Sequence, residues 1–197
     1  VSELLFVAWQ SLISRLSGQR DFTIYESCEA RKVEDLRGAL GPYDRYLPAQ
    51  CHLEDDLLER QIQLVTAELR RATDSLEYAE AGDEGLVSGK AIAFEFAEPN
   101  AWNGESLTVS LARETVFINP FKLKLSCTRS DNRLSLQLQY DSHLFHRDTV
   151  ARFIDYLQRL IGGLAPTVKL DTIDILRKLV AFDTTSRLGG VRSPKPS

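Results

Sequence analysis

The side chains with the clearest capacity for chemistry are three histidines and three cysteines. His143 and His146 are three residues apart, a spacing that can bind a divalent metal on a helix, and Asp141 and Asp148 lie close by in the sequence. The histidine pair falls at the corner between an expected strand and an expected helix, and short motifs of this kind are weak evidence. We therefore expect no metal site.

The neighbouring Cys51 and His52 could form a thiol nucleophile with its base. Adjacent residues on a strand point to opposite faces, however, so these two side chains cannot easily meet. Cys28, Cys51 and Cys127 are odd in number and far apart in the sequence, which favours reduced thiols that pack as small core residues.

The composition is typical of a globular protein with one sizeable core. The chain has 197 residues, of which 43% are hydrophobic and 26% are charged. A net charge of -4 argues against a nucleic-acid partner, which usually requires a concentrated basic surface. No apolar run approaches the roughly 20 residues that span a bilayer, and no signal-peptide pattern precedes the first helix. We expect a cytoplasmic protein with no membrane partner.

The helices and strands that must position any site are visible as two kinds of periodicity. Apolar residues at helical spacing predict helices over residues 2–16, with Ser2 as N-cap and Gly18 as stop, over 57–78, and over 150–161, with a stop at Gly162 and Gly163. Alternating residues predict strands over 22–26, 91–96, 107–111, 121–127 and 134–140, the last two forming a hairpin. Residues 43–53 are expected to be extended, and Pro48 indicates an edge or irregular position.

The two ends of the chain differ in character. The first residues already lie at a helix start and the chain contains no methionine, which predicts a piece of a longer protein. The tail from Thr184 is rich in Ser, Gly, Pro and basic residues, which is typical of a linker. Trp102 lies in a polar loop, where it could be an exposed contact or, as we favour, an anchor of that loop.

The order of these elements resembles the C-terminal lobe of a nonribosomal peptide synthetase condensation domain, which has a chloramphenicol-acetyltransferase-like fold. Four stretches carry the resemblance: residues 12–21 (LISRLSGQRD), 40–48 (LGPYDRYLP), 138–145 (LQYDSHLF) and 173–185 (IDIL…FDTT). Together with the final amphipathic helix they cover the chain from residue 7 to about residue 185.

The resemblance implies an α/β (α+β) fold: a two-layer sandwich whose mixed, mostly antiparallel sheet is covered by helices, forming half of the complete fold. Residues 1–183 would be the lobe and residues 184–197 a flexible linker or tail. The implied function is to form the acceptor side of the tunnel in which carrier-bound substrates are joined by an amide bond. The implied partners are the N-terminal lobe of the same domain and the carrier and adenylation domains. Phosphopantetheine would be carried by the partner carrier proteins and not bound directly by this chain.

By the same resemblance, six residues are expected to lie between the lobes or along the tunnel. They are Arg31, Gly41, Tyr43, Asp44, Arg45 and Tyr46. Arg31 occupies the position of the family's interlobe arginine, while Asp44, Arg45 and Tyr46 replace a Val-Asn-Thr sequence in the tunnel wall.

The family's catalytic motif, His-His-x-x-x-Asp-Gly, is absent from this sequence. We therefore expect no catalytic residue here, and expect the catalytic half of an active parent enzyme to lie upstream. Two glycines of the turn before Arg31 are replaced by Glu26 and Ala30, and residues 72–78 keep little of the motif H-Q-D-x-P-F-E. These changes leave open a second hypothesis, a degenerate noncatalytic module that recruits a tailoring enzyme or other partner in the synthetase.

Overall fold

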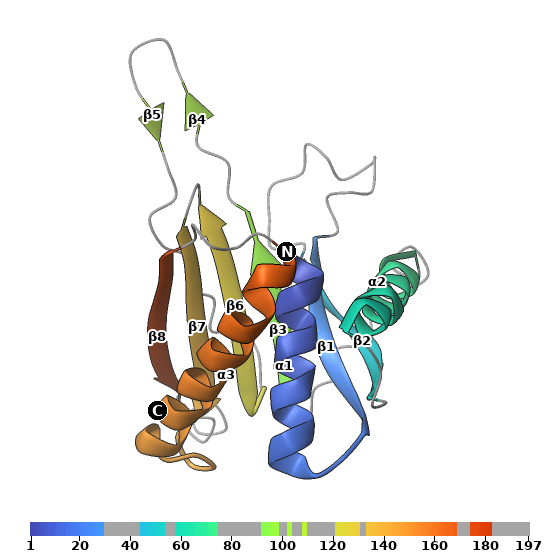
Figure 1. The fold of residues 1–197 in the computed structure, drawn as a ribbon. Helices are drawn as coiled ribbons and strands as arrows, with labels where there is room; N and C mark the ends of the chain where they lie inside the picture. Colours follow the sequence, from blue (N-terminus) through green and yellow to red (C-terminus); the bar gives the residue numbers. More distant parts are fainter. Residues whose placement is uncertain are drawn as a thin grey trace, which may run out of the picture.

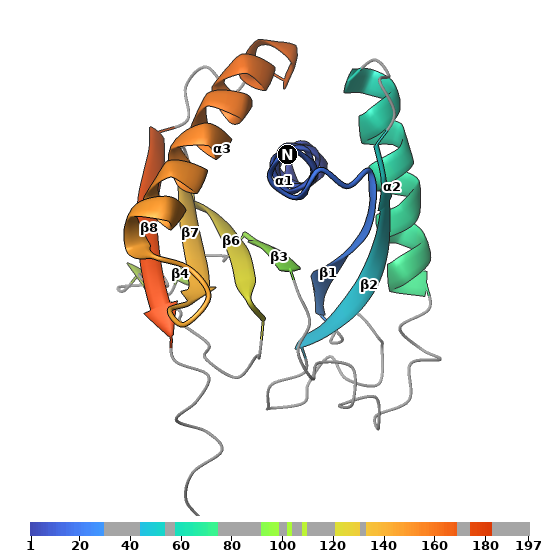
Figure 2. The same cartoon turned by 90° about the horizontal axis from the view of Figure 1, so that it is seen from below.

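Three helices cover one face of a six-stranded sheet in the part of the chain that the structure describes (Figures 1 and 2). The structure is a computed structural model, and it describes residues 1–29, 44–53, 58–74, 92–98, 102–103, 108–109, 121–130, 133–168 and 174–182. Seen end-on in Figure 2, α1 (Ser2–Ser17) lies between α2 (Leu58–Asp74) and α3 (Arg147–Val168). The fold is thus the predicted two-layer sandwich.

The strands follow the order β2-β1-β3-β6-β7-β8 across the main sheet. Their bounds are β1 (Asp21–Glu29), β2 (Asp44–His52), β3 (Ile92–Ala97), β6 (Leu123–Ser130), β7 (Arg133–Asp141) and β8 (Asp174–Phe182). The β1–β2 and β6–β7 pairs are antiparallel, whereas β1–β3, β3–β6 and β7–β8 are parallel. The predicted mixed sheet is confirmed. Among the described strands of this main sheet, however, three pairs are parallel and two are antiparallel, so the sheet is not mostly antiparallel as expected.

Helix α1 is the centre of the hydrophobic core. Every residue from Leu4 to Gln10 is buried, as are Leu12 and Ile13, because α2, α3 and the sheet surround the helix. The predicted stop is confirmed: Gly18 has a φ of 72°, and its N–H donates to the Ser14 carbonyl at 2.8 Å. The predicted N-cap is off by one residue, since the helix begins at Ser2 and its cap is Val1.

Helix α3 is longer than predicted at both ends. It begins at Arg147, and it continues through Gly162 and Gly163 to Val168, so the expected stop at these glycines is wrong. A glycine permits the left-handed conformation that ends a helix but does not require it. Neither glycine has a positive φ here, and the cost of keeping glycine in a helix is only about 1 kcal/mol each.

The edge strand β2 is held by a helix as well as by its neighbour β1. Pro48 lies in this strand, which confirms the predicted edge position, because an edge strand needs hydrogen bonds on one side only. On the outer side, the backbone N–H of Gln50 donates to Glu68 Oε1 of α2 at 3.1 Å. Glu68 also accepts from Arg71 at 2.6 Å, so α2 covers part of this sheet edge.

A second, two-stranded sheet formed by β4 (Trp102–Asn103) and β5 (Thr108–Val109) lies beyond the end of the main sheet in Figure 1. The expected strand over residues 107–111 is present in the part that is described, and Trp102 belongs to a short strand. The prediction that the Trp102 side chain anchors its loop falls outside the described residues. None of the described helices combines the length and the apolar character that crossing a membrane requires.

Candidate functional site

One face of the sheet is free of the three helices, and we call it the helix-free face. Because side chains alternate along a strand, the residues between the core positions of β1, β2, β3 and β6 point to this face. The sheet register aligns Tyr25 of β1 with Ala93 of β3, and Ala93 with Lys124 of β6. Tyr46 of β2 lies opposite Ser27 of β1. The helix-free face thus carries a lysine and two tyrosines on four adjacent strands.

Lys124 is the most unusual side chain on this face, since it is charged and only 4% exposed. Its ammonium group lies 2.5 Å from Glu95 Oε2 and donates a hydrogen bond to the Tyr46 hydroxyl oxygen. It also lies 5.0 Å from the centre of the Tyr46 ring. Burial alone would lower the pKa of Lys124, but the oxygens of Tyr46 and Glu95 outweigh it, so the pKa lies above its ordinary value of 10.5. Lys124 is therefore a buried, paired cation.

Glu95 is held from two sides on strand β3. Its Oε2 atom accepts hydrogen bonds from Lys124 and from Ser126 Oγ, the latter at 3.0 Å. Ser126 lies directly opposite Glu95 in the register of β3 and β6. The Glu95 side chain is 27% exposed, so its carboxylate is partly solvated while the lysine that pairs with it is not.

Small residues allow the long side chains to meet across the sheet. Strands β2 and β6 are separated by β1 and β3, which places their backbones roughly 14 Å apart at the usual strand spacing. Tyr46 and Lys124 nevertheless contact each other diagonally: Ser27 lies beside Tyr46 on β1, and Ala93 lies beside Lys124 on β3. Ala93 is fully buried beneath this contact, in a cluster with aromatic rings.

Aromatic packing fixes the ring of Tyr46. The Phe121 ring lies 4.7 Å from it at an interplanar angle of 58°, and the Tyr25 ring lies 6.1 Å from Phe121. These distances are typical of favourable tilted aromatic pairs. The cluster of Tyr46, Lys124, Glu95 and Phe121 is a preorganised group of polar and aromatic side chains, and it is our candidate site.

The structure describes some of the six residues predicted from the resemblance and not others. Arg31, Gly41 and Tyr43 lie outside the described residues. Asp44 and Arg45 begin strand β2, where their backbones pair with Glu29 and Cys28, but their side chains are outside the description. The side chain of Tyr46 is described, and it lies in the candidate site.

Sequence reasoning missed Lys124 and Glu95. Each is a charged residue between apolar neighbours on a strand, a pattern that predicts an exposed position on the face opposite the core. The available signal was that opposite charges occur on two strands of the same sheet, but their pairing depends on strand order, which the sequence pattern alone did not provide.

His143 and His146 lie in different segments of the described structure. His143 lies in the turn after β7, where its backbone N–H donates to Asp141 Oδ1 at 2.9 Å. His146 directly precedes α3, and its carbonyl accepts from the N–H groups of Thr149 and Val150. Among the residues that the structure describes, no three His, Cys, Asp or Glu side chains are grouped so that they could hold a metal ion.

The cysteines are free thiols in the core, as predicted. Cys51 is buried on the helix side of β2, and burial raises its pKa to about 12. His52 is exposed on the other side and pairs with Asp21, so Cys51 and His52 do not meet. Burial likewise raises the pKa of Cys127, so neither thiol is an activated nucleophile.

A separate hollow of about 440 Å³ lies where α1 ends and β1 begins. Its lining includes Phe22 and Tyr25, which point to opposite faces of β1, together with Ile13 and Ile92. Among the described residues, β1 pairs with β3 at two positions, Tyr25 and Glu26. The hollow therefore belongs to the end of the sheet and not to the buried lysine.

Comparisons with known proteins agree with this fold. A family model described as a condensation domain matches residues 1–179. Bacitracin synthase 3 from Bacillus licheniformis is 25% identical over 187 residues, which cover 88% of this chain and 3% of that protein. The chain thus spans a small part of the length of such relatives, which are nonribosomal peptide synthetases.

Solved structures show the same fold. The first condensation domain of the calcium-dependent antibiotic synthetase, in complex with a substrate analogue, aligns with a TM-score of 0.61 and 12% identity, over 87% of this chain and 39% of that one. A four-domain nonribosomal peptide synthetase bound to AMP and glycine aligns with a TM-score of 0.63 and 16% identity, over 83% of this chain and 14% of that one. These structures have a chloramphenicol-acetyltransferase-like fold, which this chain shares in part, and the chain belongs to the condensation-domain family.

Proposed function

We propose that this chain is the C-terminal, acceptor-side lobe of a condensation domain in a nonribosomal peptide synthetase. The observation that carries the proposal is that 87% of the chain aligns with only 39% of a solved condensation domain. A complete domain therefore needs a second part, and the helix-free face is a suitable surface for it. Residues 1–183 would form the lobe, and residues 184–197 the linker that follows strand β8.

In this proposal the lobe supplies positioning, and the acid–base chemistry resides elsewhere. The amine of an acceptor group attacks the thioester of a donor group, and holding the two together removes much of the barrier. Tyr46 lies on the helix-free face and would line the acceptor side of the tunnel. Arg31, Gly41, Tyr43, Asp44 and Arg45 would extend this wall or contact the other lobe.

The partners follow from the same architecture. The N-terminal lobe would pack against the helix-free face and meet the β4–β5 sheet, which lies beyond the main sheet (Figure 1). Carrier domains would deliver both substrates on phosphopantetheine, and an adenylation domain would follow the linker. We propose a cytoplasmic location for the assembly.

The test uses the full-length protein with its carrier domains loaded. We expect a His-His-x-x-x-Asp-Gly motif in the part of the protein that precedes residue 1, and loss of the condensed product in mass spectra when its second histidine is changed to alanine. A Tyr46→Ala variant should raise the KM for the acceptor carrier more than it lowers kcat. Product that still forms at the parental rate after the histidine change would refute the proposed function.

A second candidate function is a noncatalytic module that recruits a tailoring enzyme. The altered family positions favour it, particularly Glu26, which replaces a family glycine and lies within β1, and the sequence Asp44-Arg45-Tyr46. If this function is correct, the full-length protein lacks an intact histidine motif, and deletion of the domain abolishes tailoring of the carrier-bound intermediate without loss of any peptide bond.

A further inference from the structure

The two oxygens of Glu95 have different surroundings. Both hydrogen-bond donors that reach this carboxylate, Lys124 Nζ and Ser126 Oγ, contact the same atom, Oε2. The other oxygen, Oε1, has no donor within the part of the chain that the structure describes. A carboxylate oxygen accepts up to two hydrogen bonds. An oxygen that accepts none, next to a buried cation, lowers the stability of the protein unless water or a ligand supplies a donor.

The position of this oxygen is well defined. Lys124 is buried and contacts both Glu95 and Tyr46, while Ser126 lies opposite Glu95 in the register. Two donors from the neighbouring strand β6 therefore fix the carboxylate, and Oε1 remains on a side chain that is 27% exposed. A rigid element carrying an oriented acceptor is the arrangement expected for a binding site.

We propose that Glu95 Oε1 binds the free amino group of the acceptor substrate. The inference rests on the proposed function, in which Tyr46 lines the acceptor side, because Lys124 joins Glu95 to Tyr46 directly. An aminoacyl thioester differs from other acyl thioesters by its amine, which donates hydrogen bonds. An ionised carboxylate only accepts hydrogen bonds and is therefore a suitable partner for this amine. The role is positioning: Glu95 holds the amine, and no proton transfer is assigned to it.

The expected preference for an amine is moderate. Hydrogen bonds to charged groups are worth more than neutral ones, and a fully available carboxylate could favour an ammonium group by up to about a hundredfold. Lys124 already neutralises much of the Glu95 charge and repels a second cation. We therefore expect a preference of about tenfold.

A purely structural role of Glu95 makes a different prediction. If the carboxylate only joins β3 to β6 through Lys124, then its removal alters the binding of all ligands to a similar degree. If Oε1 binds the amine, then its removal affects amine-bearing ligands selectively. The ratio of two dissociation constants separates these roles, because a general loosening of the site cancels in the ratio.

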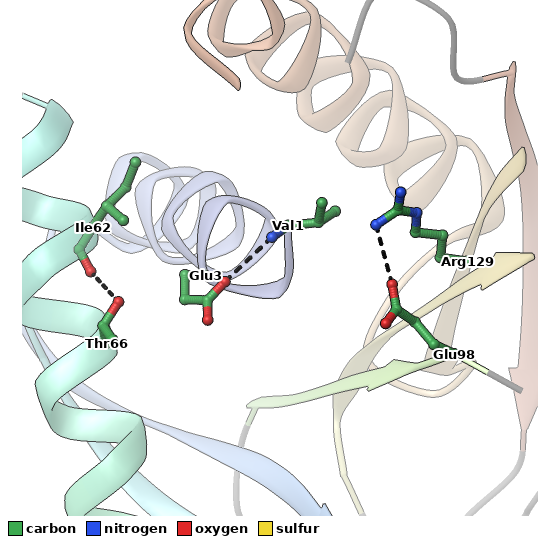
Figure 3. A network of polar contacts seen from close by, with 6 residues as sticks. All are labelled: Val1, Glu3, Ile62, Thr66, Glu98 and Arg129. Atoms are coloured by element: carbon green, nitrogen blue, oxygen red, sulfur yellow. Dashed lines mark hydrogen bonds and ion pairs between the residues drawn. The ribbon is translucent and has the colours of Figure 1, made fainter. Parts of the chain in front are cut away.

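The experiment measures this ratio by calorimetry in the full-length protein. The two probes are glycyl pantetheine amide, which carries an amine, and acetyl pantetheine amide, in which hydrogen replaces the amino group. The wild-type protein should bind the glycyl probe about tenfold more tightly, and Glu95→Gln should reduce the ratio to about one. The matched control is Glu98→Gln, which makes the same chemical change on an exposed carboxylate that pairs with Arg129 at 3.2 Å (Figure 3). This control should keep the wild-type ratio.

A second variant is needed in case Glu95→Gln does not fold. Glu95→Asp keeps the negative charge opposite Lys124 but withdraws both oxygens by one methylene, so the ratio should fall at least threefold. A tenfold preference that survives in a folded Glu95 variant overturns the inference, as does equal binding of the two probes by the wild type. Equal binding leaves the proposed function standing, whereas binding of neither probe refutes both proposals.

Discussion

Removing either member of the Lys124–Glu95 pair should destabilise the protein, but by different amounts. Glu95→Gln leaves an ammonium group that is only 4% exposed with a neutral hydroxyl partner, and we expect a loss of about 3 kcal/mol. Lys124→Met leaves a carboxylate that is 27% exposed and still bound by Ser126, so water compensates part of the loss and we expect about 1.5 kcal/mol.

Urea unfolding followed by circular dichroism measures the difference. With a slope of about 2 kcal/mol per molar urea, the two midpoints should differ by roughly 0.7 M. The double variant should cost less than the sum of the single changes, because no buried charge is then left without its partner. The Glu98→Gln control, in a solvent-exposed pair, should change the unfolding free energy by less than about 0.5 kcal/mol.

The pH dependence provides an independent check of the same pair. The folded-state pKa of Lys124 lies above its ordinary value of 10.5, so its stabilising effect is complete below that pH and disappears as pH rises through the folded-state pKa. The stability difference between wild type and Lys124→Met should therefore be constant from pH 6 to pH 9 and shrink at higher pH. Equal costs of the two single changes, additive costs in the double variant, or a difference that grows at alkaline pH would refute the reasoning.

Three further predictions concern glycines in and after helices, a buried thiol, and the small residue Ala93 beside the candidate site. Gly163→Ala should raise the unfolding free energy by about 0.5–1 kcal/mol, because the helix continues through this position and no atom lies near an added Cβ. Gly18→Ala should lower the unfolding free energy by about 1 kcal/mol, because φ is 72° at this residue. Thermal unfolding of the two variants checks the opposite signs. In the folded protein, Cys51 should react with a disulfide reagent at pH 8 only as fast as the structure around it opens, because the thiol is buried and burial raises its pKa to about 12. Rapid labelling without denaturant would contradict this. Ala93→Leu should lower the unfolding free energy by about 1–3 kcal/mol and separate Tyr46 from Lys124. The separation should change the near-ultraviolet circular dichroism of the tyrosines, and an unchanged spectrum would argue against close packing of Tyr46 and Lys124 beside this residue.

Local periodicity predicted the elements well and their ends less well. The alternating leucines at 134, 136 and 138 are all buried in β7, and the hairpin with β6 forms as expected. The stop at Gly162 failed because the same residue type is compatible with a helix end and with a helix interior; the helix continues, and Leu164, which follows the two glycines, packs against the core. Pattern thus determines which face is buried, whereas tertiary contacts determine where an element ends.

The candidate site was predictable only in part. Tyr46 followed from the family resemblance, but the partners of its hydroxyl and ring did not. Lys124 has the sequence context of an exposed strand residue, yet it is buried and contacts Tyr46 of β2, from which two strands separate it in the sheet. Such a contact requires the strand order β2-β1-β3-β6, in which sequence neighbours are not always neighbours in the sheet.

The burial of helix α1 also has a consequence for biosynthesis. The ribosome makes α1 before α2 and α3, but its apolar surface is covered on all sides only after α3 has packed beside it, more than 100 residues later. Contacts this distant in the chain form slowly, and an apolar helix that waits for them is prone to association with other chains. Translation that pauses before α3 should therefore leave a nascent chain that depends on chaperones, with α1 as the segment they bind.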